Sequence, residues 1–384
     1  MYSKPAPVSL TGMALMMMGL YLFCVPFFMA SYMQKLLLAA VAFAYFDALV
    51  LRRIKPGRDE LAVFGFSLWA LALIFTMPLD GSTEYIAIRF FSVFAVYSLT
   101  KRLAISRRRW MLLGLCYIAG CFIAAGLVLY SWLLGESIAG RFTVEGLNAN
   151  YVAYCLATAV PVVISLYWSS GRARSIGLAV FSVAVFGFAI VLTGSRGAVG
   201  ALVAALGIFC LYQLRSRMFV GVLTAAAVMA ASYGAFLLVP EETQMRLMGD
   251  FAGGSADVAF TGRLEVWPYA LKLYSENPIF GVGPGAFAET NPLLIGAHNV
   301  FLSVAVETGT VGLVLFVIAT VICARRARYL SWGHWGKWSM FVLLAVWTPI
   351  AFTGIWETAP ASWFAWAWTG NIALLFPGER ETGG

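Results

Sequence analysis

Residues 110–134 have the sequence WMLLGLCYIAGCFIAAGLVLYSWLL and contain no charged side chain. An α-helix needs about 20 consecutive apolar residues to cross the hydrocarbon layer of a bilayer, and this run is long enough. Comparable runs recur along the whole chain of 384 residues, which is 61% hydrophobic and only 11% charged. A soluble globular chain carries about 25% charged residues. The sequence therefore predicts an all-α, polytopic membrane protein.

Working outward from this run, we expect about twelve transmembrane helices joined mostly by short polar connections. Their expected bounds are 9–30, 33–51, 61–79, 85–100, 110–134, 149–168, 175–193, 198–214, 218–239, 299–323, 338–356 and 360–376. The fourth is short, and Pro349 and Pro360 interrupt the aromatic-rich tail that holds the last two. All six cysteines lie in apolar runs, so we interpret them as small packing residues.

Most of the 26 lysines and arginines fall in alternate connections, as in Arg107-Arg108-Arg109 and Arg325-Arg326. Basic connections stay on the cytoplasmic side of a membrane. We therefore expect both termini in the cytoplasm. The net charge of +8 mostly reflects this retention signal, and it is not evidence for nucleic-acid binding.

The longest interruption between apolar runs covers residues 240–297 and is expected on the outer side. It divides the chain into three parts: residues 1–239 with nine transmembrane helices, this large outer loop, and residues 298–384 with three helices and a cytoplasmic tail. Apolar residues at nearly helical spacing predict helices along the membrane surface in the loop, with no β domain. The sequence GVGPG at 281–285 lacks the GxGxxG spacing of dinucleotide sites, so we expect a tight turn that folds the loop back onto helix ends.

A few basic residues are expected on the outer side, where cytoplasmic retention does not explain them: Lys35, Arg89, Arg141, Arg196, Arg246, Arg263 and Lys272. Arg196 lies in TGSRGA, a turn between two long apolar helices, and begins the second of them. A helix start favours a bound anion, and guanidinium groups bind phosphate through a bidentate fork. Snorkelling to the lipid headgroups is the competing interpretation for each residue, above all for Lys35, Arg246 and Lys272.

His298 directly precedes the tenth expected helix. Neutral imidazole can take a proton from an attacking hydroxyl group, which makes His298 a candidate general base. Alternatively, it only precedes a helix cap at Asn299. Carboxylates on the outer side compete for the same role: Glu136, Glu145, Asp257, Glu265 and Glu289. Metal binding is not expected, because the other histidine, His334, falls on the cytoplasmic side and no cysteine lies in an outer connection.

Several short motifs share the outer side. They are Arg141 followed by NAN at 148–150, GSRGA at 194–198, Arg263 with Trp267, NPIFGVGPG at 277–285, AHNVFL at 297–302 and ETG at 307–309. In this order they resemble the O-antigen ligase and O-antigen polymerase superfamily, and the resemblance covers roughly residues 140–315.

The resemblance implies a multi-span glycosyltransferase architecture in a bacterial inner membrane, with a periplasmic active site. It implies an undecaprenyl-pyrophosphate-linked glycan as donor, a sugar hydroxyl of lipid A–core as acceptor, and no metal or other cofactor. In such a site His298 would act as general base. Arg141, Arg196 and Arg263 would bind the pyrophosphate, with Arg89 and Lys35 as further candidate contacts.

One large outer loop favours a ligase over a polymerase, in which a second lipid-linked glycan is the acceptor and two large loops are common. A protein-glycosylating transferase with the same donor stays open. A transporter or flippase is the alternative from a different class. The sequence argues against it, because no convincing internal repeat is present and the polar residues gather in one outer loop.

Overall fold

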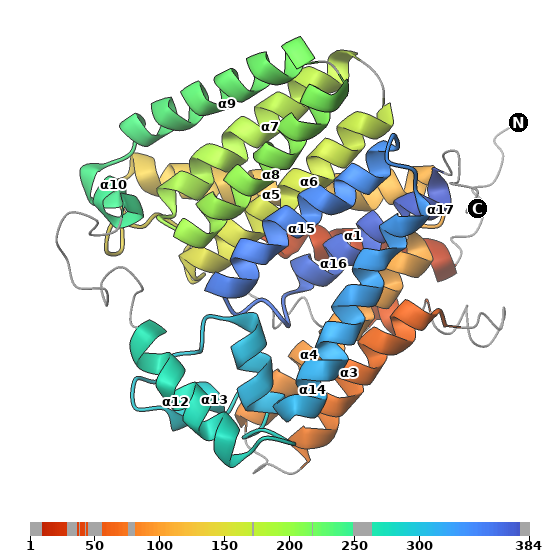
Figure 1. The fold of residues 1–384 in the computed structure, drawn as a ribbon, viewed down its shortest axis with the longest axis vertical. Helices are drawn as coiled ribbons and strands as arrows, with labels where there is room; N and C mark the ends of the chain where they lie inside the picture. The colour runs from red at the N-terminus through yellow and green to blue at the C-terminus, as the bar shows by residue number, and fades with distance from the viewer. Residues whose placement is uncertain are drawn as a thin grey trace, which may run out of the picture.

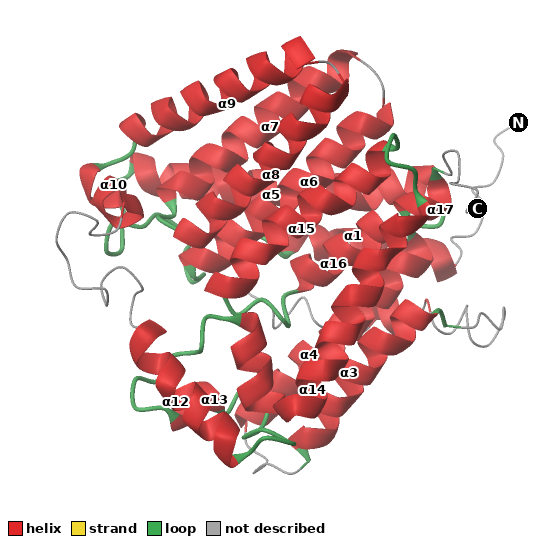
Figure 2. Cartoon of the chain, in the orientation of Figure 1, coloured by secondary structure: helices red, strands yellow, loops and turns green. Residues whose placement is uncertain are grey.

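The structure, a computed structural model, describes residues 10–28, 37, 39–42, 44, 56–75, 81–170, 173–216, 218–248 and 263–376. Over these ranges the chain forms helices and loops and contains no strand (Figures 1 and 2). The helices are α1 (Leu10–Cys24), α3 (Arg58–Ile74), α4 (Gly81–Leu103), α5 (Arg107–Leu133), α6 (Ala149–Ser170), α7 (Ala173–Leu192), α8 (Arg196–Ser216), α9 (Met218–Leu238), α10 (Glu241–Met248), α12 (Arg263–Glu276), α13 (Phe287–Thr290), α14 (Val300–Arg325), the 3-10 helix η2 (Arg326–Tyr329), α15 (Trp335–Thr353), α16 (Pro360–Gly370) and α17 (Ile372–Leu375). The predicted all-α class is confirmed for this part of the chain.

The helices follow the apolar runs. Of the expected spans, 33–51 lies mostly outside the described residues, and 360–376 is divided at Asn371 into α16 and α17. The helices α5, α6, α8, α14 and α15 are each long and apolar enough to cross a bilayer, and α1 and α7 are apolar but contribute shorter segments. A polytopic membrane protein is therefore confirmed, while the number of twelve spans and the orientation stay predictions.

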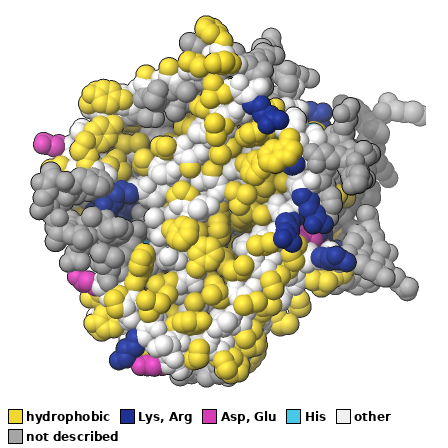
Figure 3. Space-filling view, in the orientation of Figure 1, with side chains coloured by type: hydrophobic (Ala, Val, Ile, Leu, Met, Phe, Trp, Pro, Cys, Tyr) yellow, Lys and Arg dark blue, Asp and Glu magenta, His cyan; other side chains and the backbone are white. Residues whose placement is uncertain are grey.

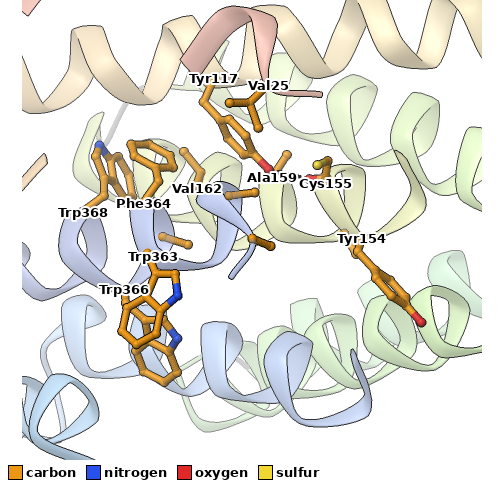
Figure 4. Close-up of a cluster of buried hydrophobic side chains, with 14 of the residues drawn as sticks. Val25, Tyr117, Tyr154, Cys155, Ala159, Val162, Trp363, Phe364, Trp366 and Trp368 are labelled. Atoms are coloured by element: carbon orange, nitrogen blue, oxygen red, sulfur yellow. Dashed lines mark hydrogen bonds between the residues drawn. The ribbon is translucent and has the colours of Figure 1, made fainter. Parts of the chain in front are cut away.

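The centre of the helix assembly is α16, whose residues are buried from Ala361 to Gly370. Trp110 of α5 and Trp368 of α16 stack with ring centroids 4.0 Å apart. Each indole Nε1 donates to the other residue's carbonyl oxygen, at 3.0 and 2.8 Å. Tyr117 donates to the Cys155 carbonyl at 2.8 Å in the same region (Figure 4). Paired indole N–H groups and carbonyls satisfy polar atoms that lipid or packed side chains would leave unpaired.

An ionic cluster joins α3 and α4 to η2. Asp59 accepts from Lys101 at 2.5 Å and from Arg326 at 2.6 Å, and Glu60 accepts from Arg102 at 2.7 Å. Asp59 and Glu60 are 8% and 3% exposed, so these charges are withdrawn from water and depend on their partners. Arg326 was expected in a cytoplasmic connection, and the structure adds that it joins helix ends together with Lys101 and Arg102.

The segment expected as an outer loop is helical in its described residues, with α10, α12 and α13 and no strand; residues 249–262 fall outside them. Val266, Ala270, Phe287, Ala297 and Val306 form a small hydrophobic core of their own, which packs α12 and α13 against the first turns of α14. The helical prediction is confirmed for these residues.

The glycine-rich stretch at 281–285 folds back onto α14, as expected. Gly309 leaves the helical conformation with φ 68° and ψ −174°, which breaks α14 and exposes backbone groups. The stretch satisfies them: Val282 N–H donates to Val306 O at 2.9 Å, and Gly283 N–H donates to Glu307 O at 3.0 Å. Interrupted helices are tolerated at membrane depth only where protein supplies such partners.

The helices of this segment lie at one edge of the molecule, on the left in Figure 1, and α17 lies at the opposite edge. The face between them is broadly apolar, and Lys and Arg side chains gather toward both edges (Figure 3). Exposed large side chains such as Leu115, Leu178 and Phe181 suit contact with lipid tails.

Candidate active site

Arg141 lies in a tight connection between α5 and α6. Ile138 and Arg141 exchange two backbone hydrogen bonds of 3.0 and 3.2 Å, and Phe142 N–H donates to the Leu192 carbonyl at 3.1 Å. The guanidinium Nε donates to the Thr193 carbonyl at 2.9 Å, and one NH₂ donates to Asn150 Oδ1 at 2.5 Å. Arg141 is thereby tied to the turn that precedes Arg196.

That turn is built around two glycines. Gly194 has φ 62°, a left-handed conformation that favours glycine. A Cβ atom at Gly197 would overlap Thr353 and lie 3.0 Å from the Tyr154 hydroxyl, so only glycine permits this close approach of α8 to α15 and α6. Arg196 is the first residue of α8. The structure thus brings Arg141 and Arg196, two of the predicted phosphate ligands, to one turn at a helix start, where an anion is favoured.

The electrostatics of this turn involve a residue expected mainly as a lipid anchor. Burial and the nearby charge of Arg246 lower the pKa of Arg141 to about 10. Arg246 is carried by α10, which follows the turn by many residues in the chain. Sequence reasoning assigned Arg246 to the large outer loop but held no signal for this proximity.

His298 sits at the entrance to α14 with φ 49°, in the left-handed region. Asn299 caps the helix, and its side-chain oxygen accepts from Leu302 N–H at 3.1 Å. The preceding residue, Ala297, is buried, and its carbonyl accepts from Trp267 Nε1 of α12 at 2.9 Å. The expected cap at Asn299 is confirmed. An unfavourable backbone conformation held by neighbours on both sides is typical of positioned functional residues.

The connection that follows α15 links the turn at Gly194–Gly197, which contains Arg196, to the segment directly before His298. Thr353, at the end of α15, faces Gly197, and Tyr154 donates to the Thr353 carbonyl at 3.0 Å. Ile355 lies against Gly296, because a Cβ atom there would overlap its Cδ1. The Cα atoms of residues 353 and 355 are at most about 7 Å apart. The two predicted parts of the site therefore meet the same short stretch of chain.

The remaining predicted ligands are placed differently. Arg263 is the first residue of α12, the helix that supplies Trp267, and nothing further is described of its side chain. Lys35 lies outside the described residues. Arg89 of α4 donates to Thr358 Oγ1 at 2.6 Å. These roles stay predictions.

Arg89 belongs to a buried polar group that sequence reasoning did not identify. Glu357 is 4% exposed and accepts from Ser303 Oγ at 3.1 Å. Burial raises its pKa, an effect that the charge of Arg89 partly opposes. The carboxyl group of Glu307, on α14, lies near enough to interact with both Arg89 and Glu357. The available signal was the presence of two carboxylates in or beside apolar helices, where such residues are rare and usually paired.

The carboxylates that compete with His298 are dispersed over the surface. Glu136, Glu145, Glu265 and Glu289 are exposed, and Asp257 lies outside the described residues. In the described residues, His298 is the candidate held by a cap on one side and by an indole hydrogen bond on the other. This favours His298 as the positioned base.

The fold and this site define a polytopic helical membrane protein in which the connection after α15 contacts both the helix start at Arg196 and the segment before His298. Residues 180–317 match the model of a family described as O-antigen ligase. The chain is 28% identical over 299 residues to an O-antigen ligase of Pseudomonas aeruginosa, and the match covers 73% of this chain and 68% of that protein. The family match includes the motifs around Arg196, Arg263 and His298. The resemblance to the O-antigen ligase family that the motifs indicated is thus confirmed.

Proposed function

We propose that the protein is an O-antigen ligase of lipopolysaccharide biosynthesis, with its active site on the periplasmic side of the inner membrane. It transfers a glycan from undecaprenyl pyrophosphate to a sugar hydroxyl of lipid A–core. The observation that carries the proposal is the connection 353–355. It contacts both the turn at Arg196, to which the Arg141 side chain is hydrogen-bonded, and the segment before His298. The arginines for the leaving pyrophosphate and the histidine for the acceptor hydroxyl would then act near the same stretch of chain.

The reaction assigns each side chain one task. His298 takes the proton of the acceptor hydroxyl while that oxygen forms a bond to the anomeric carbon of the donor glycan. The bond from the anomeric carbon to the pyrophosphate oxygen breaks, and the electron pair leaves with undecaprenyl pyrophosphate. Arg141, Arg196 and Arg263 stabilise the negative charge that grows on this leaving group.

Purified protein in lipid nanodiscs, supplied with a lipid-linked glycan and lipid A–core, tests the proposal. We expect glycan on lipid A–core with the wild type. His298→Ala should lose about 10²–10⁴-fold in rate while still binding the donor. Acidification should lower the wild-type rate, because protonated imidazole accepts no proton, and His298→Gln should lack this dependence.

The same assay separates the alternatives. Transfer only onto a second lipid-linked glycan would indicate a polymerase, and transfer onto a protein would indicate a protein-glycosylating enzyme. Movement of lipid-linked glycan across the bilayer without any new glycosidic bond would refute the proposed function. Arg196→Ala should abolish transfer, and Arg196→Lys should restore little, since one ammonium group does not reproduce the guanidinium fork.

A further inference from the structure

The short helix α10 is hydrogen-bonded to the connection that contains Arg141. Thr243 of α10 is fully buried, and its hydroxyl donates to the Gly140 carbonyl at 2.9 Å. This bond joins α10 to the residue directly before Arg141. Arg246 lies about one helical turn after Thr243, on the same short helix, so its position relative to Arg141 is set by packing and not by a free loop.

The two arginine side chains flank the glycine turn. A Cβ atom at Gly194 would lie 3.0 Å from Arg246 Cδ, 3.5 Å from Arg246 Nε and 3.5 Å from Arg141 Cγ. The missing side chain at Gly194 therefore allows both arginine stems to pass this turn, directly before Ser195 and Arg196. The location of Arg246 in the last turn of α10 suits the helix dipole, but the dipole does not require contact with Gly194.

Within the part of the chain that the structure describes, the pair carries positive charge without a counter-ion. Across the described ranges, neither Arg141 nor Arg246 forms an ion pair with a carboxylate, and the side-chain acceptors of Arg141 are a carbonyl and an amide oxygen. The proximity of Arg246 disfavours the charged form of Arg141. Ser195 is 2% exposed, and its hydroxyl has no partner among the described residues. Two adjacent guanidinium groups and a spare hydroxyl are the chemistry of a phosphate site.

We propose that Arg246 pairs with Arg141 across Gly194 to bind the pyrophosphate of the lipid-linked donor. This inference rests on the proposed function and adds a ligand from α10 to it. A pyrophosphate carries more charge and more acceptor oxygens than a single phosphate, so it suits two guanidinium groups better. The phosphates of lipid A have related chemistry, and the experiment separates the two sources.

Binding is measured with purified protein in nanodiscs of uncharged lipid, by native mass spectrometry or by competition. The probes are undecaprenyl pyrophosphate, undecaprenyl phosphate and lipid A, none of which carries the transferred glycan. We expect Arg246→Ala to weaken undecaprenyl pyrophosphate binding about 10- to 100-fold, with a smaller loss for undecaprenyl phosphate. Lys272→Ala is the matched control and should change nothing, because Lys272 is 73% exposed and faces Glu276 at 4.0 Å.

Three results would overturn the inference: wild-type affinity for undecaprenyl pyrophosphate in Arg246→Ala, an equal loss in Lys272→Ala, or a loss confined to lipid A. Size-exclusion profiles check folding, and Arg246→Gln, which keeps a polar stem, replaces the alanine variant if that variant aggregates. Failure of the proposed function is a separate result, since it requires that the wild type makes no glycosidic bond. Wild-type transfer with unimpaired pyrophosphate binding in both Arg246 variants would refute only the role of Arg246.

Discussion

Replacing Trp267 by phenylalanine tests whether the histidine segment must be held in place. The change keeps an aromatic ring and removes the Nε1–H bond of 2.9 Å to the Ala297 carbonyl. Ala297 is 1% exposed, so water does not replace the lost donor. Leaving a buried acceptor unsatisfied costs about 1–3 kcal/mol.

That cost acts on a residue already in an unfavourable conformation. His298 has φ 49°, and a left-handed non-glycine residue costs about 1–2 kcal/mol, which the surrounding contacts must offset. Without the indole bond the segment is free to relax. If the whole 1–3 kcal/mol appears as loss of the productive histidine orientation, turnover falls about 5- to 150-fold. Donor affinity should stay nearly constant, because the substitution does not touch Arg141 or Arg196.

The assay is glycan transfer at varied donor concentration, which separates kcat from KM. Trp338→Phe is a matched control: it removes an indole bond of 3.0 Å to the Trp332 carbonyl, in a region expected on the cytoplasmic side. We expect kcat to fall in Trp267→Phe alone. Wild-type kcat in that variant, or a change confined to donor KM, would show that the indole bond does not position His298.

Cysteine introduced at Ser137, which is exposed, should react with an impermeant thiol reagent from the periplasm, whereas cysteine at exposed Ser106 should not; the reverse pattern would invert the topology. Asp59→Asn should lower the melting temperature of the detergent-solubilised protein, since removing one partner of a buried ion pair typically costs about 3–5 kcal/mol, and an unchanged melting temperature would contradict this. Gly281→Ala should also destabilise the protein and reduce transfer, because Gly281 has φ 74° and a Cβ atom would collide with the Glu307 backbone; a fully active, equally stable variant would exclude that clash.

The fold class and the helix bounds follow from the sequence alone. Inside a bilayer the backbone must satisfy its own hydrogen bonds, so an uncharged run such as 110–134 has essentially one conformation open to it. The helix α5, Arg107–Leu133, accordingly lies within a few residues of the expected span. The same reasoning identified the capped start of α14 at Asn299 and the fold-back of residues 281–285, because glycine and asparagine have conformational roles that act locally.

The composition of the site depends on tertiary structure. Nothing in the spacing of Arg141 and Arg246 along the chain indicates that both side chains lie against Gly194. Their proximity depends on where α10 packs. The partners of Arg89 were equally hidden, because Thr358, which accepts its hydrogen bond, and the nearby carboxyl group of Glu357 lie in a distant connection near the C-terminal end. A sequence pattern reports which face of a helix is apolar and where the helix ends. Side-chain packing between segments far apart in the chain decides which helix ends meet. This packing also determines which residues surround the charged groups, the glycines and the buried carbonyls.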